Sequence, residues 1–106
     1  MLYASKARQT NERKAMLRNI ISAAKSNTIK YLEKKAKSLT TEDINIKDND
    51  GNTPLHFACL KGHTDMAKTL LKLGARINDR NKDGNTPLHL AFKGDNHRVI
   101  STLIIS

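Results

Sequence analysis

From Thr53 the chain reads Thr53-Pro54-Leu55-His56-Phe57-Ala58, and further along it reads Thr86-Pro87-Leu88-His89-Leu90-Ala91. The match extends toward the N-terminus, because ten of the seventeen residues in 44–60 are identical to their counterparts in 77–93. A fixed period of about 33 residues, met twice in register, is typical of a repeat protein whose units each form one small supersecondary structure. The repeat therefore determines the expected fold, and the rest of the chain is interpreted in its register.

Local signals around the first copy predict a turn followed by two short helices. Residues 48–52 read Asp-Asn-Asp-Gly-Asn, a composition that favours a turn. Thr53 can cap the first helix, and Pro54 suits its first position, where a missing N–H group costs nothing. Gly62 interrupts the helical pattern, and Gly74 is placed to end a second helix.

With this period and its Thr-Pro-Leu-His-x-Ala motif, the chain resembles the ankyrin repeat family. This resemblance implies an all-α solenoid in which pairs of helices stack and are joined by β-turn loops. We expect four segments along the chain: a flexible N-terminus, a degenerate capping repeat, a repeat, and a repeat truncated at its second helix. These are residues 1–10, 11–47, 48–80 and 81–106, respectively.

The capping repeat is interpreted from its apolar spacing. That spacing predicts one helix that begins near Asn11, a candidate N-cap, and a second helix after the break at residues 26–28. Residues 37–43 take the place of a short Gly-Ala turn, and we expect them to form an extended polar connection. Three helix pairs would result, which is about the minimum for a stable stack.

Positive charge is concentrated in the first part of the chain. Residues 1–47 carry eleven Lys and Arg against four acids, and residues 48–106 carry eight against six, within a net charge of +9. No stretch has the apolar length of a secretion signal or of a membrane span. The single cysteine, Cys59, leaves no partner for an intramolecular disulfide and suits a reducing compartment. We therefore expect a cytoplasmic protein without a membrane span, or one secreted into a host cell if its source is a bacterium.

The histidines and the cysteine are interpreted as structural. The resemblance implies that His56 and His89 hydrogen-bond to the backbone of the turn and of the next repeat. Stacked helices lie ~8–10 Å apart, which disfavours a zinc ion shared by these two side chains. Cys59 stands where the family usually has alanine, so we expect a small buried residue. The chain also lacks a phosphate-binding Gly-Lys-Ser/Thr loop. We expect no enzyme activity, no cofactor and no metal.

The resemblance implies a protein-binding module, because ankyrin repeats contact other proteins through their turn tips and the concave face of their first helices. By position, the expected contact residues fall at two turn tips and at the ends of two first helices. They are Asn49, Asp50, Asn52, Lys82, Asp83 and Asn85 at the tips, and Leu60, Lys61 and Lys93 at the helix ends. An exposed leucine beside a polar tip is a typical interface anchor. Ordinary packing against the neighbouring helix is the alternative for Leu60.

Two further hypotheses concern the ends of the chain. The basic N-terminal region, residues 6–37, can bind nucleic acid or an acidic partner electrostatically, and the alternative is a solvated polar face. Only Tyr3 and Tyr31 lie in or near that region, too few aromatic residues for a base-stacking platform. At the other end, the apolar residues beyond Val99 suggest weak self-association, because a terminal repeat usually needs a polar outer face.

Overall fold

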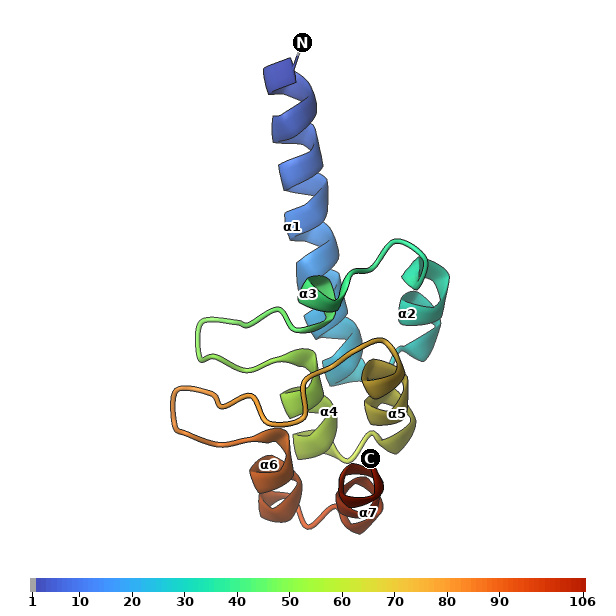
Figure 1. The fold of residues 1–106 in the computed structure, drawn as a ribbon, viewed down its shortest axis with the longest axis vertical. Coiled ribbons are helices and arrows are strands. Elements are labelled where there is room, and N and C mark those ends of the chain that lie inside the picture. Colours follow the sequence, from blue (N-terminus) through green and yellow to red (C-terminus); the bar gives the residue numbers. More distant parts are fainter. Residues whose placement is uncertain (1) are drawn as a thin grey trace.

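The computed structural model describes residues 2–106, with side chains described from Glu12 onward. Over this range the chain forms helices only, and no strand. They are α1 (Leu2–Ser26), α2 (Ile29–Lys35), α3 (Thr41–Ile44), α4 (Pro54–Lys61), α5 (Thr64–Lys72), α6 (Pro87–Lys93) and α7 (His97–Ile105). Two rows of helices result, α1, α4 and α6 in one and α2, α5 and α7 in the other (Figure 1). Each helix pair packs on its neighbours in the stack, which confirms the expected all-α solenoid.

The two motif helices begin as the sequence predicts. Thr53 caps α4 through a reciprocal capping box with His56, and Pro54 occupies the first turn. The same box joins Thr86 and His89 at the start of α6. The helices end at left-handed residues, Gly62 with φ 74° after α4 and Asp95 with φ 55° after α6. An aspartate thus adopts at the second turn the conformation that glycine adopts at the first.

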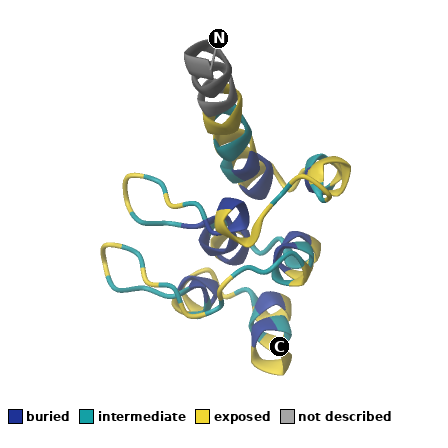
Figure 2. Cartoon of the chain, turned by 45° about the horizontal axis from the view of Figure 1, so that its top comes forward, coloured by how far each residue is buried: buried dark blue, intermediate teal, exposed yellow. Residues whose placement is uncertain are grey.

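The core lies between the two rows and follows the predicted apolar faces (Figure 2). Every helix contributes at least one fully buried side chain to it, so the repeats share one continuous core. The largest of these side chains are Ile20, Leu32, Ile44, Leu55, Met66, Leu70 and Val99. Because each repeat buries its faces only against its neighbours, removal of one pair would expose the core of the next.

Two predictions for the capping repeat are wrong. Position 11 lies inside α1 rather than at a helix start, because α1 already begins at Leu2. Residues 37–43 are not wholly extended, since α3 begins within them at Thr41. Thr40 and Asp43 form a capping box there, and Asp43 and Ile44 are buried. The expected flexibility of residues 1–10 stays a prediction, because their side chains lie outside the described set.

The third repeat contains a second helix of ordinary length. Helices α5 and α7 both have nine residues, and Ile105 at the end of α7 corresponds to Lys72 at the end of α5. The expected truncation of this repeat at its second helix stays a prediction. The molecule measures 51 × 28 × 21 Å, and its radius of gyration is 14.2 Å. A compact domain of this length would have about 13 Å. The excess reflects α1, which projects beyond the stack (Figure 1).

Candidate protein-interaction surface

Each turn tip is shaped by the side chain that opens it. Asp48 Oδ1 accepts hydrogen bonds from the N–H groups of Asp50 and Asn52, both at 2.9 Å. In the next tip, Asn81 Oδ1 accepts the equivalent bonds at 3.0 and 2.9 Å. Such side-chain acceptors replace a backbone turn and hold the loop in one conformation. The tips are therefore rigid despite their exposure.

The two tips are also joined to each other. The Lys82 N–H group donates to the Asp50 carbonyl at 3.0 Å, and Asn81 Nδ2 donates to Asn52 Oδ1 at 2.8 Å. Asn52 is consequently half-buried and engaged within the protein, as the equivalent Asn85 is half-buried. Four of the six predicted tip residues are exposed at the loop surface. They are Asn49, Asp50, Lys82 and Asp83.

The end of α4 is also joined to the third repeat. Asn96 Nδ2 donates to the carbonyls of Cys59 and Leu60 at 2.8 and 2.9 Å, which fastens the third repeat to the end of α4. A Cβ atom on Gly94 would stand 2.7 Å from the Leu60 carbonyl oxygen, so only glycine permits this approach. The Leu60 side chain stays 41% exposed while its backbone is held. Lys61, which follows Leu60 in the sequence, and Lys93, the counterpart of Leu60 in the third repeat, are both exposed.

His56 links the second repeat to the third, as the resemblance implied. Its Nδ1 accepts from the Thr53 N–H group at 3.0 Å, and its Nε2–H donates to the Asn85 carbonyl at 2.9 Å. Complete burial lowers the pKa of His56 from 6.5, and the Asn85 carbonyl partly offsets this effect. The imidazole is therefore held neutral and structural. His63 makes a comparable link, from Nδ1 to the Ala24 carbonyl at 3.2 Å.

His89 repeats only half of this arrangement. Its Nδ1 accepts from the Thr86 N–H group at 3.0 Å, but the ring is exposed, and Nε2 makes no hydrogen bond to the described residues. Cys59 is fully buried, as expected, and burial raises the pKa of its thiol to about 12. The thiol is thus protonated and inert at neutral pH.

Two other kinds of feature are absent from the described residues. No three His, Cys, Asp or Glu side chains in that part of the chain are grouped as metal ligands. None of its helices is both long enough and apolar enough to cross a membrane.

Sequence reasoning missed Phe92, whose side chain is 59% exposed. Phe92 occupies in its repeat the position that Cys59, which is 0% exposed, occupies in the preceding one. Equivalent positions thus carry a large exposed residue and a small buried one. Ile104 and Ile105 are exposed by 68% and 85%. The alignment of the two copies contained this signal, because an aromatic side chain fits poorly at a position that a stacked helix approaches closely.

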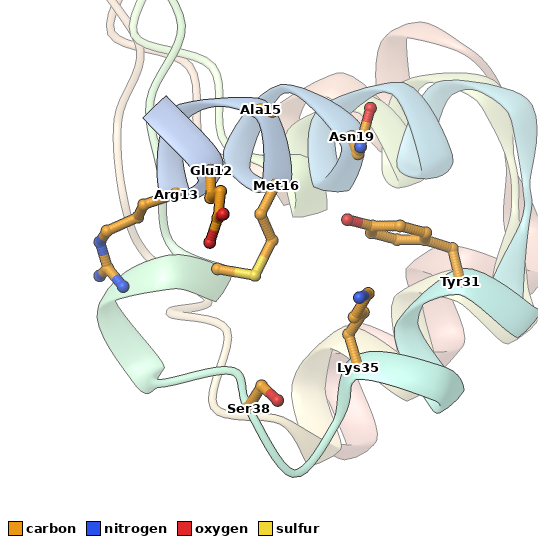
Figure 3. Close-up of a pocket in the computed structure, with 8 residues that line it drawn as sticks. All are labelled: Glu12, Arg13, Ala15, Met16, Asn19, Tyr31, Lys35 and Ser38. Carbon is orange, nitrogen blue, oxygen red and sulfur yellow. The ribbon is translucent and has the colours of Figure 1, made fainter. Parts of the chain in front are cut away.

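A groove between α1 and α2 was not predicted either (Figure 3). It encloses about 700 Å³ between the projecting part of α1, the second helix and the start of the linker that follows it. Its lining residues are Glu12, Arg13, Ala15, Met16, Asn19, Tyr31, Lys35 and Ser38. All Lys and Arg side chains of residues 12–37 are exposed, and Arg13 and Lys35 line the groove. The exposed side chains are Arg13, Lys14, Arg18, Lys25, Lys30, Lys34, Lys35 and Lys37. Lys6 and Arg8 lie outside the described side chains.

Comparison with known proteins gives the same repeat architecture. A family model described as ankyrin repeats, three copies, matches residues 20–106. Human BCL-6 corepressor-like protein 1 is 44% identical over 64 residues, which are 60% of this chain and 4% of that protein. Acyl-CoA-binding domain-containing protein 6 from Rattus norvegicus is 38% identical over 55 residues, or 52% of this chain and 19% of that protein. Human protein fem-1 homolog C is 44% identical over 36 residues, or 34% of this chain and 6% of that protein.

These matches cover only a small part of each relative, so they concern the repeats and not the activities of the whole proteins. The family match covers most of the chain and includes the degenerate first repeat from Ile20 onward. Repeats of this type are generally protein–protein interaction modules. The chain belongs to the ankyrin repeat family.

Proposed function

We propose that this chain is an adaptor or effector-type binder that holds another protein against its turn tips and the ends of α4 and α6. The observation that carries the proposal is that hydrogen bonds join both parts of this surface across repeats. Lys82 bonds to Asp50 at the tips, and Asn96 bonds to Leu60 at the helix ends. A surface held in this way loses little conformational entropy on binding, which favours affinity.

Leu60 is the proposed anchor of the interface. Its side chain is 41% exposed, whereas the neighbouring Cys59 is fully buried, so Leu60 is not part of the core. Leu60 lies six residues after Pro54, so it stands ~9 Å along the axis of α4 from the start of that helix. A partner that spans tip and helix end would bury on the order of 1,200 Å² in total, the lower end of the standard range.

Affinity capture with a matched pair of double variants tests the proposal. Leu60→Ala with Lys61→Ala removes the anchor, and Lys68→Ala with Lys72→Ala changes residues of α5 as a control. Capture uses lysate with and without nuclease at two salt concentrations. The proposal predicts that one protein is recovered after nuclease and high salt, and that only the first variant weakens its capture, by about tenfold. An equal loss for both variants, or a loss of thermal stability in the first, would overturn the assignment.

A second candidate function is supported by the exposed cations of the N-terminal region. We propose that residues 6–37 can bind nucleic acid or an acidic partner, because the Lys and Arg of 12–37 are all exposed and few acids lie among them. Affinity through this region should fall steeply with salt. Replacement of Lys34, Lys35 and Lys37 by glutamine should lower it without any effect on the tips. Capture that vanishes with nuclease would identify nucleic acid as the ligand.

A further inference from the structure

The groove between α1 and α2 has an apolar wall. The side chains of Met16 from α1 and Tyr31 from α2 face each other across the groove. Lys35 and Ser38 line its side away from α1 (Figure 3). Met16 and Tyr31 are only partly buried, although both pack against the core. The hollow of about 700 Å³ is larger than any single side chain, so a peptide segment can enter it.

Arg13, which lines the groove, also forms an ion pair that the sequence did not suggest. Arg13 of α1 is paired with the Asp43 carboxylate, which is 0% exposed, while Arg13 itself is 48% exposed. Asp43 Oδ2 also accepts from the Thr40 N–H group at 3.0 Å. A buried carboxylate needs such partners. The pair therefore fixes α3 and the linker before it against α1, and the groove does not have to form on binding.

The charge around the groove selects its occupant. The Arg13 charge is neutralised by Asp43, whereas Lys35 forms no ion pair with the described residues. Glu12 is the only acid in the lining, and Lys14 and Lys34, the sequence neighbours of the lining residues Arg13 and Lys35, are further exposed cations. A second copy of this chain is a poor occupant, because its net charge is +9 and residues 48–106 are positive as well. An apolar anchor with acidic neighbours complements both the wall and the charge.

We propose that this groove binds an acidic peptide segment, with one large apolar side chain between Met16 and Tyr31 and carboxylates facing Lys35 and its neighbours. The proposal rests on the second candidate function and gives it a site. It is independent of the surface around Leu60. The Leu60→Ala, Lys61→Ala variant therefore keeps the groove, and a groove variant keeps the tips, so failure of one assignment is distinguishable from failure of the other.

Three fluorescent probes test the occupant. The first is a peptide of six glutamates around one phenylalanine, the second has alanine in place of the phenylalanine, and the third is single-stranded oligothymidylate of equal charge. The full chain is titrated into each by fluorescence anisotropy at low salt. We expect the phenylalanine peptide to bind about tenfold more tightly than the alanine peptide, because one aromatic side chain leaves water. Equal binding of the two peptides, or tighter binding of the oligothymidylate, overturns the proposal.

Two matched pairs of variants locate the site. Ser38→Trp fills the groove without a change of charge, and Ser101→Trp adds the same ring to an exposed position of α7. Lys35→Glu and Lys72→Glu each reverse one charge in the last turn of a second helix. The proposal predicts that Ser38→Trp and Lys35→Glu each bind the phenylalanine peptide at least fivefold more weakly, roughly the effect of one interface contact. It predicts no more than about a twofold change for the two controls. Equal losses within the charge-reversal pair would show binding by net charge alone, and equal losses within the tryptophan pair would show an effect that is not specific to the groove; either result overturns the proposal. Circular dichroism and thermal unfolding of each variant establish that it is folded.

Discussion

The repeat at 48–80 and the repeat at 81–106 carry the same motif in different surroundings. In the first, His56 is fully buried and its Nε2 bonds to Asn85 of the next repeat, while in the second His89 is exposed. Cys59 is 0% exposed, while its counterpart Phe92 is 59% exposed. Identical or equivalent positions thus differ in burial because only one of the repeats is covered on its far side. In a solenoid the neighbour, more than the residue type, determines how much a motif position contributes to stability.

The largest expected effect comes from exchanging the side chains at the equivalent positions 59 and 92. Cys59→Phe places an aromatic ring where the third repeat packs closely, and we expect it to lower the free energy of unfolding by about 3 kcal/mol. Phe92→Cys should change it by less than about 0.5 kcal/mol, because position 92 is mostly exposed. Urea unfolding followed by circular dichroism measures both. Similar losses in the two variants would show that position 92 is covered in solution.

The motif histidines give the second test of the comparison. His56→Ala leaves the buried Thr53 N–H group and the Asn85 carbonyl without their partner, so we expect a loss of about 2 kcal/mol. His89→Ala removes only the local bond with Thr86, at an exposed site, and should cost about 0.5–1 kcal/mol. The same urea titration compares them. If His89→Ala proved the more costly, the role assigned to the inter-repeat bond would be wrong.

The sequence was sufficient for several features that depend on the repeat register. The starts of α4 and α6, the turns before them, the burial of Cys59 and the hydrogen bonds of His56 all follow from a motif met twice. The capping box of Thr40 and Asp43 was missed although it has the Thr-x-x-Asp spacing, because the linker was compared with a shorter turn. The signal for this capping box lies within residues 40–43 alone, and alignment of the linker with the other repeats drew attention away from it.

The groove could not be predicted from the register. It depends on the extra length of α1 and on the contact of Arg13 with Asp43, which lie far apart in the sequence and have no paired counterpart in the other repeats. A single basic residue and a single acid give no sequence signal of pairing. Phe92 differs, since the alignment of the two motif copies already contrasted it with Cys59. Its exposure was predictable, and it was overlooked.

A smaller effect is expected from pH, and it follows from the lowered pKa of His56. The unfolded chain binds a proton near pH 6.5, whereas the buried imidazole in the folded chain binds it only at lower pH. Stability should therefore be constant above about pH 7 and decrease as the pH falls through 6.5. Nearby Asp79 opposes the shift and Lys47 adds to it.

The decrease should reach at most about 1.4 kcal/mol at pH 5.5, one unit below the pKa of the unfolded chain. Urea unfolding at pH 7.5, 6.5 and 5.5 measures it. His56→Gln should abolish most of the slope, because the lowered pKa of His56 is its source. Stability that rises on acidification would contradict the burial of a neutral His56.

The smallest expected effect is self-association through the end of the third repeat, which we propose from Phe92, Ile104 and Ile105. Full burial of each of these side chains is worth about 1.5–3 kcal/mol. Loss of translational and rotational freedom on association costs at least about 4 kcal/mol. The difference leaves a dissociation constant of about 1 mM or weaker. Sedimentation equilibrium at high protein concentration should show a rising average mass.

Phe92→Ser with Ile104→Ser should abolish this rise in average mass, and Leu60→Ser should preserve it, because Leu60 belongs to the other surface. A monomer mass at all concentrations in the unmodified chain would remove the proposal, and the exposure of Phe92 would then reflect only the absence of a covering neighbour.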